Sequence, residues 1–155
     1  MRFLAVLGIA LMLGACANTS DSGNQPAGAI GTISPHTAGN ALVMDDGAKL
    51  PLRSWLPEGK PRAVILALHG FNDYSNAFTD PATKWRKRGV ATFAYDQRGF
   101  GRAPDRGRWV GTRRLDADLA EASRLLRARY PGTPLFVLGE SMGGAVAITA
   151  VAGSA

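Results

Sequence analysis

The strongest constraint on this chain is a Gly-Glu-Ser-Met-Gly segment, residues 139–143, between an apolar run at 135–138 and small apolar residues at 143–152. This order predicts a strand, a sharp turn and a buried helix. Gly139 and Gly143 suit such a turn, because a Cβ at either position would collide with the neighbouring strand or helix. The turn would raise the Ser141 hydroxyl at the carboxyl edge of a sheet. We therefore interpret Ser141 as a nucleophile, with a purely structural turn as the alternative.

The strands expected before this turn predict an α/β sheet. Residues 62–68 and 90–95 are almost continuously apolar, which is typical of strands buried on both faces of a parallel sheet. Two further strands are expected at 41–44 and 50–55, and the Asp-Asp-Gly sequence at 45–47 predicts a hairpin between them.

Helical patterns separate these strands. Residues 112–130 carry apolar side chains at helical spacing and charges elsewhere, and Pro131 follows them. Residues 76–88 are weakly periodic and are followed by Gly89, a candidate C-cap. A hairpin followed by alternating strands and helices predicts a mostly parallel sheet with helices on both faces.

A second element of a hydrolytic site is expected at His69-Gly70-Phe71, which ends the buried run at 62–68. The backbone N–H groups of Phe71 and Met142 could together form an oxyanion hole, with Gly70 allowing close approach. In a hydrolase with this turn the catalytic His follows the Ser, so we expect His69 to shape the loop rather than to act as the base. His36 lies in the predicted tether and is expected to be inert.

These motifs together resemble one family. The chain is similar to the monoacylglycerol lipase and lysophospholipase (serine aminopeptidase-like) group of the α/β-hydrolase superfamily from about residue 41 onward. The matching pieces are Asp46-Gly47 with Trp55 and Pro57, His69-Gly70-Phe71, the Asp-Gln-Arg-Gly-Phe-Gly segment at 96–101, and residues 139–144. The resemblance implies the α/β-hydrolase fold and an ester or lipid substrate. It also implies a structural role for Asp96, Arg98, Gly99 and Gly101, which would tie their strand to neighbouring loops.

The chain departs from that family after Ser141. Residues 142–155 contain no Asp, Glu or His, whereas a triad needs a base and an acid beside the Ser. We therefore expect residues 39–155 to be the N-terminal half of an α/β-hydrolase domain, inactive by itself. The alternative is a non-catalytic, membrane-anchored lipoprotein that uses a partial hydrolase scaffold for binding.

The N-terminus predicts export and lipidation. Residues 1–15 have a short basic start and an apolar run too short to span a bilayer, and Leu13-Gly14-Ala15-Cys16 resembles a bacterial lipobox. We expect residues 1–15 to be a lipoprotein signal peptide, Cys16 to carry the lipid, and residues 16–38 to form a flexible tether. Because Ala17 rather than Asp follows the Cys, the cell envelope location is expected to be the outer membrane rather than the inner one.

The net charge of +6 raises the question of nucleic acid. Thirteen of the 18 basic residues lie between Lys84 and Arg129, but acidic residues are interleaved with them and no nucleic-acid motif accompanies them. A solvated face is therefore expected, and nucleic acid is not an expected partner. The expected partners are a small-molecule ester or lipid and a membrane, and no cofactor or metal is expected.

Overall fold

The computed structural model describes residues 35–153. The predicted signal peptide, Cys16 and nearly all of the predicted tether lie outside the described residues.

The described part contains one six-stranded sheet with the order β1-β2-β3-β5-β4-β6. Its strands are β1 (His36–Ala38), β2 (Ala41–Val43), β3 (Lys49–Trp55), β4 (Ala63–Leu68), β5 (Val90–Tyr95) and β6 (Leu135–Gly139). The first three strands are antiparallel to their neighbours, whereas β5, β4 and β6 run parallel to one another. The predicted hairpin turn is present, with Gly47 at φ 80° and its N–H donating to the Met44 carbonyl at 2.9 Å.

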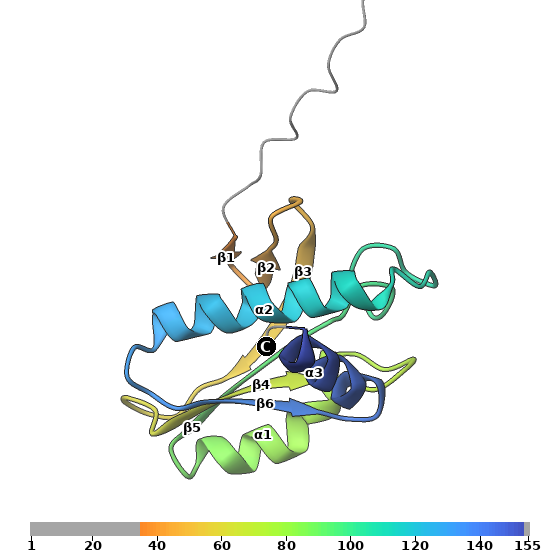
Figure 1. The fold of residues 1–155 in the computed structure, drawn as a ribbon. Coiled ribbons are helices and arrows are strands. Elements are labelled where there is room, and N and C mark those ends of the chain that lie inside the picture. Colours follow the sequence, from red (N-terminus) through yellow and green to blue (C-terminus); the bar gives the residue numbers. More distant parts are fainter. Residues whose placement is uncertain (1–34, 154–155) are drawn as a thin grey trace, which may run out of the picture. The chain divides into compact units, whose positions relative to one another are not determined.

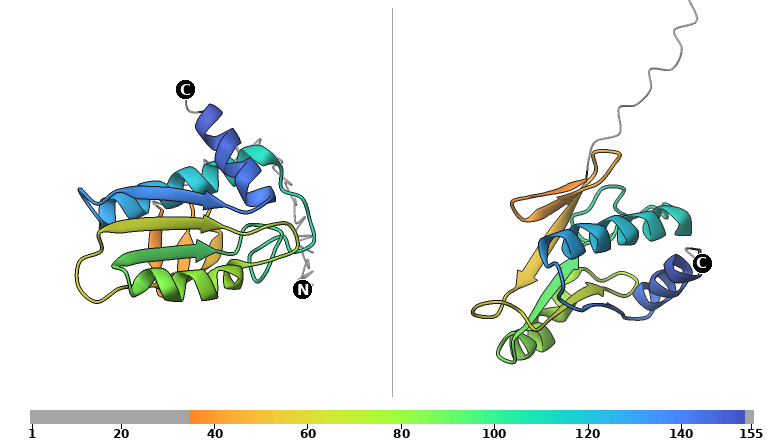
Figure 2. Two further views of the ribbon diagram at one scale, coloured as in Figure 1. Left: turned by 90° about the horizontal axis from the view of Figure 1, so that it is seen from below. Right: turned by 60° about the vertical axis from the view of Figure 1, so that its left-hand side comes forward.

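Helices cover both faces of this sheet, as predicted (Figures 1 and 2). A short 3₁₀ helix, η1 (Ser75–Phe78), and α1 (Thr79–Arg86) cover one face, while α2 (Thr112–Arg129) and α3 (Met142–Ala152) cover the other.

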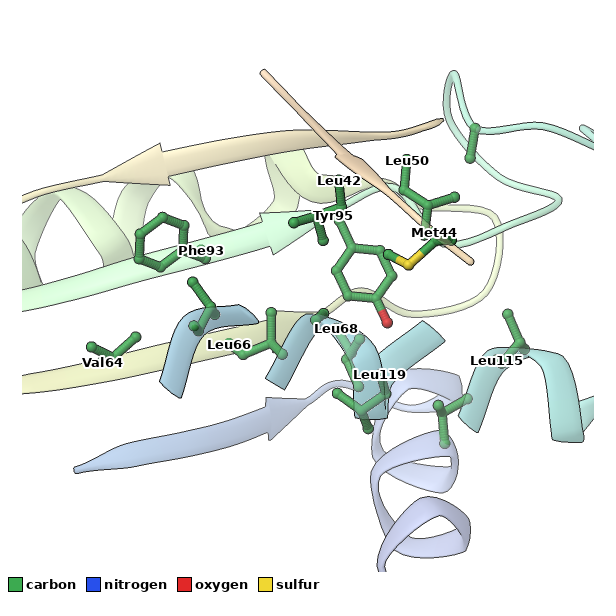
Figure 3. Close-up of a cluster of buried hydrophobic side chains, with 14 of the residues drawn as sticks. Leu42, Met44, Leu50, Val64, Leu66, Leu68, Phe93, Tyr95, Leu115 and Leu119 are labelled. Atoms are coloured by element: carbon green, nitrogen blue, oxygen red, sulfur yellow. The ribbon is translucent and has the colours of Figure 1, made fainter. Parts of the chain in front are cut away.

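Because helices cover both faces of the sheet, a strand between them such as β4 is apolar along its whole length. Val64, Leu66 and Leu68 of β4 belong to the larger cluster, which includes the α2 residues Leu115 and Leu119 (Figure 3). The intervening Ile65 and Ala67 pack in a second cluster with Phe78 on the opposite face. Since successive strand residues point to opposite faces, a strand covered on both sides must be apolar throughout.

Two segments differ from the predictions. His36–Ala38 is strand β1, paired with β2 through a Gly39-Asn40 turn, so the folded part begins before the expected boundary at residue 39. The helix expected at 76–88 begins instead with the 3₁₀ turn η1, and its α-helical part is only Thr79–Arg86. Pro81 explains the later start of the α-helix. It has no N–H to donate to the carbonyl of residue 77, so residue 77 cannot take part in α-helical hydrogen bonding.

Strand β6 lies at the edge of the sheet in residues 35–153, with β4 as its neighbour. Its apolar residues Phe136, Val137 and Leu138 are exposed. None of the helices in this part of the chain combines the length and the apolar character needed to cross a membrane.

Candidate active site

The candidate site lies where two neighbouring parallel strands end. β4 and β6 pair in register, with Leu68 opposite Gly139. Both strands therefore deliver the residues that follow them to the same, carboxyl edge of the sheet. The Glu140 N–H donates to the Leu68 carbonyl at 3.0 Å, which extends the pairing by one step into the turn.

Ser141 occupies the turn between β6 and α3 in a backbone conformation that L-residues rarely adopt. Its φ is 48° and its ψ is −111°, and a non-Gly residue held there costs about 1–3 kcal/mol. The side chain is exposed, and α3 begins at the next residue, Met142. The hydroxyl is thus carried on a strained turn at the N-terminal end of a helix.

Gly139 and Gly143 allow this turn to close. A Cβ on Gly139 would collide with the backbone of Gly143 and Gly144, and a Cβ on Gly143 would collide with the Leu68 carbonyl oxygen and lie 2.6 Å from its carbon. Strand β6, helix α3 and the end of β4 therefore approach one another more closely than any side chain permits. This is the steric reason for both glycines that the sequence pattern predicts.

The loop after β4 lies against the Ser141 turn. A Cβ built on Gly70 would be 3.6 Å from the Ser141 Cβ and 3.7 Å from the Glu140 carbonyl oxygen. Phe71 follows Gly70 directly, and Met142 opens α3, where the first N–H groups have no acceptor within the helix. The two backbone N–H groups expected to bind an oxyanion are therefore carried by the two segments that meet at Ser141.

His69 is fully buried and both of its ring nitrogens are engaged. The Gln97 backbone N–H donates to Nε2 at 2.9 Å, so the ring proton resides on Nδ1, which donates to the Gly70 carbonyl at 2.8 Å. Burial lowers the pKa of His69, against the opposing effect of the Gly70 hydrogen bond and the nearby acidic groups. The neutral ring therefore has neither nitrogen available to take a proton from Ser141.

The other His does not reach Ser141 either. His36 lies on β1, at the opposite edge of the sheet from β6, and the chain has two His in all. The described residues thus bring together a candidate nucleophile and candidate oxyanion donors without an available imidazole. Between residues 35 and 153 there is likewise no group of three or more His, Cys, Asp or Glu placed to hold a metal ion.

Asp96 ties the end of β5 to two loops. Its buried carboxylate accepts from the Ser75 N–H and from the Arg102 N–H, each at 2.9 Å. Gly101, at φ 56°, approaches this carboxylate so closely that a Cβ would collide with it, and Gly99, at φ 87°, approaches the Arg108 carbonyl in the same way.

Arg98 forms the centre of an ion-pair network under the β2–β3 hairpin. Its guanidinium donates to buried Asp118 of α2 at 2.7 and 3.0 Å, and to Asp46 of the hairpin at 2.7 and 2.8 Å. Arg114 adds bonds of 2.8 Å to Asp118 and to Asp45. Desolvation opposes the charge on Arg98, but the hydrogen bonds to Asp118 and Asp46 outweigh it and raise its pKa. The Arg98 hydrogen bond lowers the pKa of Asp46 to about 2.

Sequence reasoning missed Asp118, Arg114 and Gln97 as parts of this scaffold. A signal existed for Asp118, which lies three residues after Leu115 and so on the apolar face of α2, where an unpaired acid would be costly. Nothing in the sequence marks Gln97, whose amide nitrogen donates to the His69 carbonyl at 2.8 Å.

Comparison with known proteins agrees with this arrangement. Residues 59–154 match the family model of the serine aminopeptidase, S33. The chain is 33% identical over 112 residues to a monoglyceride lipase of Rattus norvegicus and 34% identical over 112 residues to that of Homo sapiens. Each alignment covers 72% of this chain but 37% of the relative.

Among solved structures, a soluble variant of monoglyceride lipase from Saccharomyces cerevisiae in complex with a substrate analog has a TM-score of 0.57 at 26% identity. That match covers 77% of this chain and 40% of the yeast chain. The fold is thus an α/β-hydrolase fold, represented in part, and the chain spans less than half the length of these relatives. The chain belongs to the serine aminopeptidase (S33) family and, within it, resembles the monoglyceride lipases.

Proposed function

We propose that this protein is a serine hydrolase of carboxylic esters, with Ser141 as its nucleophile. The observation that carries the proposal is the strained backbone of Ser141, between β6 and α3 and directly against Gly70. Strain of this kind is maintained only where surrounding structure enforces it, here through the tight approaches at Gly139 and Gly143.

The proposed reaction is acyl transfer to water through an acyl-enzyme. The Ser141 oxygen attacks the ester carbonyl, and the oxyanion accepts hydrogen bonds from the Phe71 and Met142 N–H groups. The alcohol leaves with a proton, and water then releases the acid. A base and an acid are needed for both steps. We propose that they come from sequence outside this chain, which alone would be inactive, since its match covers only 37% of the length of these relatives.

The proposed substrate is a lipid ester of the acylglycerol class. This rests on the names of the relatives, which are monoglyceride lipases. Lysophospholipids remain within the same proposal, because both substrates present a single acyl ester to the same nucleophile.

An activity-based label tests the nucleophile. We expect a fluorophosphonate probe to label the protein produced from its own gene in host cells, and we expect Ser141→Ala to abolish the label. Ser54→Ala, at an exposed Ser of β3, is the matched control and should label normally. Labelling that persists in Ser141→Ala would refute the assignment.

The alternative is a binding protein built on the same scaffold, and one observation favours it. His36 lies at the opposite edge of the sheet from β6, and both ring nitrogens of His69 are engaged in hydrogen bonds. If the protein from host cells takes no label although its unfolding is cooperative, the binding role would replace the enzymatic one.

We also propose that Cys16 anchors the protein by lipid in the bacterial cell envelope, in the outer rather than the inner membrane. The support is the sequence around Cys16 and the Ala that follows it. Cys16→Ser should abolish metabolic labelling with palmitate and leave the precursor uncleaved. Unchanged labelling in that variant would refute the anchor.

A further inference from the structure

A small aromatic cavity lies beside the loop that follows β4. Its volume is about 200 Å³, and three aromatic side chains, Phe71, Phe100 and Trp109, line it together with Asn72 and Arg108. Phe100 is nearly buried, whereas Phe71 and Trp109 are 63% and 59% exposed. The cavity therefore has an apolar floor and an open, aromatic mouth.

The aromatic rings around the cavity pack against one another. Phe100 meets Phe71 edge to face at a centroid distance of 5.3 Å, and it meets His69 edge to face at 5.8 Å. Edge-to-face contacts of this kind are the geometry that aromatic groups prefer. His69 is held by its hydrogen bonds to Gln97 and Gly70, so the floor of the cavity is fixed to the end of β4.

Most of the lining residues belong to the loop after β5, which is held by its own backbone hydrogen bonds. The Gly99 N–H donates to the Pro104 carbonyl and the Gly107 N–H donates to the Gly99 carbonyl, each at 2.9 Å. The Arg108 N–H donates to the Asp105 carbonyl at 2.8 Å. A wall held by its own backbone hydrogen bonds keeps its shape without ligand, as small-molecule sites mostly do.

The position of the cavity connects it to the candidate active site. Phe71 contributes its ring to the cavity and follows Gly70, whose Cβ position is 3.6 Å from that of Ser141. A group held in the cavity would thus lie next to the backbone N–H proposed to bind the oxyanion.

We propose that this cavity is a subsite for a phenyl-sized aromatic ring carried by the ester substrate; the proposal rests on the proposed function. Its volume suits such a ring, since an apolar cavity of about 150 Å³ is enough to bind benzene. A long acyl chain would extend far beyond it and must run elsewhere. The subsite therefore adds aryl or benzyl esters to the expected substrate class.

The test measures binding, so that it does not depend on catalysis. The probe is 4-fluorobenzyl alcohol, titrated into the full chain and followed by the broadening of its fluorine NMR signal. We expect saturable binding that benzyl alcohol competes away and glycerol does not. Trp109→Ala should weaken binding by about tenfold, because it removes one aromatic contact. Trp109 is exposed, so this variant should keep the unfolding midpoint of the wild type.

Two controls separate the subsite from the nucleophile. Tyr74→Ala removes an exposed aromatic side chain that does not line the cavity, from the loop after β4 that also carries Phe71, and it should bind the probe normally. Ser141→Ala should also bind the probe normally, even where it loses the fluorophosphonate label. The inference is overturned if Trp109→Ala binds as the wild type does, if Tyr74→Ala loses as much affinity, or if glycerol competes equally well. A wild-type protein that takes no fluorophosphonate label but binds the probe would refute the proposed nucleophile and leave the aromatic subsite in place.

Discussion

The backbone N–H of Gln97 donates to Nε2 of His69 across 28 positions of sequence, at 2.9 Å. This bond connects the residue after β5 to the residue after β4, and His69 directly precedes the loop residues Gly70 and Phe71. It also holds the imidazole neutral with its proton on Nδ1. Protonation of the ring would turn an accepting nitrogen into a second donor facing the Gln97 N–H.

We predict that stability falls as the pH is lowered through the range in which unfolded His titrates. Because burial lowers the pKa of folded His69 below the ordinary His value of 6.5, the unfolded chain binds the extra proton first. The contribution of neutral His69 to the free energy of unfolding is fully present above pH 6.5, and it is lost as the pH falls toward the pKa of folded His69. Urea unfolding midpoints measured between about pH 7.5 and pH 5 would detect it.

His69→Gln should flatten this slope, since Gln keeps one donor and one acceptor but does not titrate there. His36→Gln, on the exposed strand β1, is the matched control for the loss of one imidazole outside the core. If His69→Gln retains the full dependence on pH, the buried ring is not its source.

Gly143→Ala should disrupt the turn, whereas Gly70→Ala should not. A Cβ on Gly143 collides with the Leu68 backbone, while a Cβ on Gly70 makes ordinary contact at 3.6 Å. We expect Gly143→Ala to lower the free energy of unfolding by about 1–3 kcal/mol or more, and Gly70→Ala to change it little. Denaturant titration compares the two, and equal effects would contradict the close packing of α3 on β4.

Arg98→Met should be more destabilising than Arg114→Met. Arg98 is nearly buried and neutralises both Asp118 and Asp46, whereas Arg114 is more exposed. Removing one partner of a buried ion pair costs about 3–5 kcal/mol because the remaining charge stays buried. Arg114 still pairs with Asp118, so for Arg98→Met we expect the free energy of unfolding to fall by about 3 kcal/mol. The double variant Arg98→Met/Asp118→Leu should recover part of the loss, and no recovery would argue against burial of the charge as the cause.

The sequence predicts those parts of the fold that depend on local patterns. β5 and α2 agree with their predicted ranges to within one residue. A strand covered on both faces leaves a continuous apolar run, and a helix covered on one face leaves an apolar periodicity. The turn at Ser141 is predictable for a similar reason, since its two glycines are required by contacts within a few residues or with an adjacent strand.

The remaining features depend on partners distant in sequence. Arg98 is 52 positions from Asp46 and 20 from Asp118, and no local pattern pairs them. The aromatic cavity joins Phe71 to Trp109 only once β4 and β5 lie side by side. Strand β1 is three residues long and fully exposed, so it has no apolar alternation to reveal it, although its Gly-Asn turn is a recognised hairpin signal.

The last prediction concerns the free edge of β6. Phe136, Val137 and Leu138 are 58%, 41% and 38% exposed, and the adjacent α3 exposes Ile148 and Val151. An apolar strand with an unpaired edge offers its backbone N–H and C=O groups to another chain, and contiguous exposed apolar surface favours association. We therefore expect the chain from residue 17 to 155 to elute from gel filtration as an associated species.

Val137→Lys should shift this chain toward the monomer, because a charge on the edge strand opposes pairing with a second copy. Leu56→Lys is the matched control: Leu56 is 42% exposed, close to the 41% of Val137, but it lies in the segment between β3 and β4 rather than on β6. It adds the same charge and should leave the elution unchanged.

A sharp monomer peak with cooperative thermal unfolding in the wild type would contradict the prediction, and it would favour the binding role over the enzymatic one. An equal shift in both variants would assign the association to net charge rather than to the edge of β6.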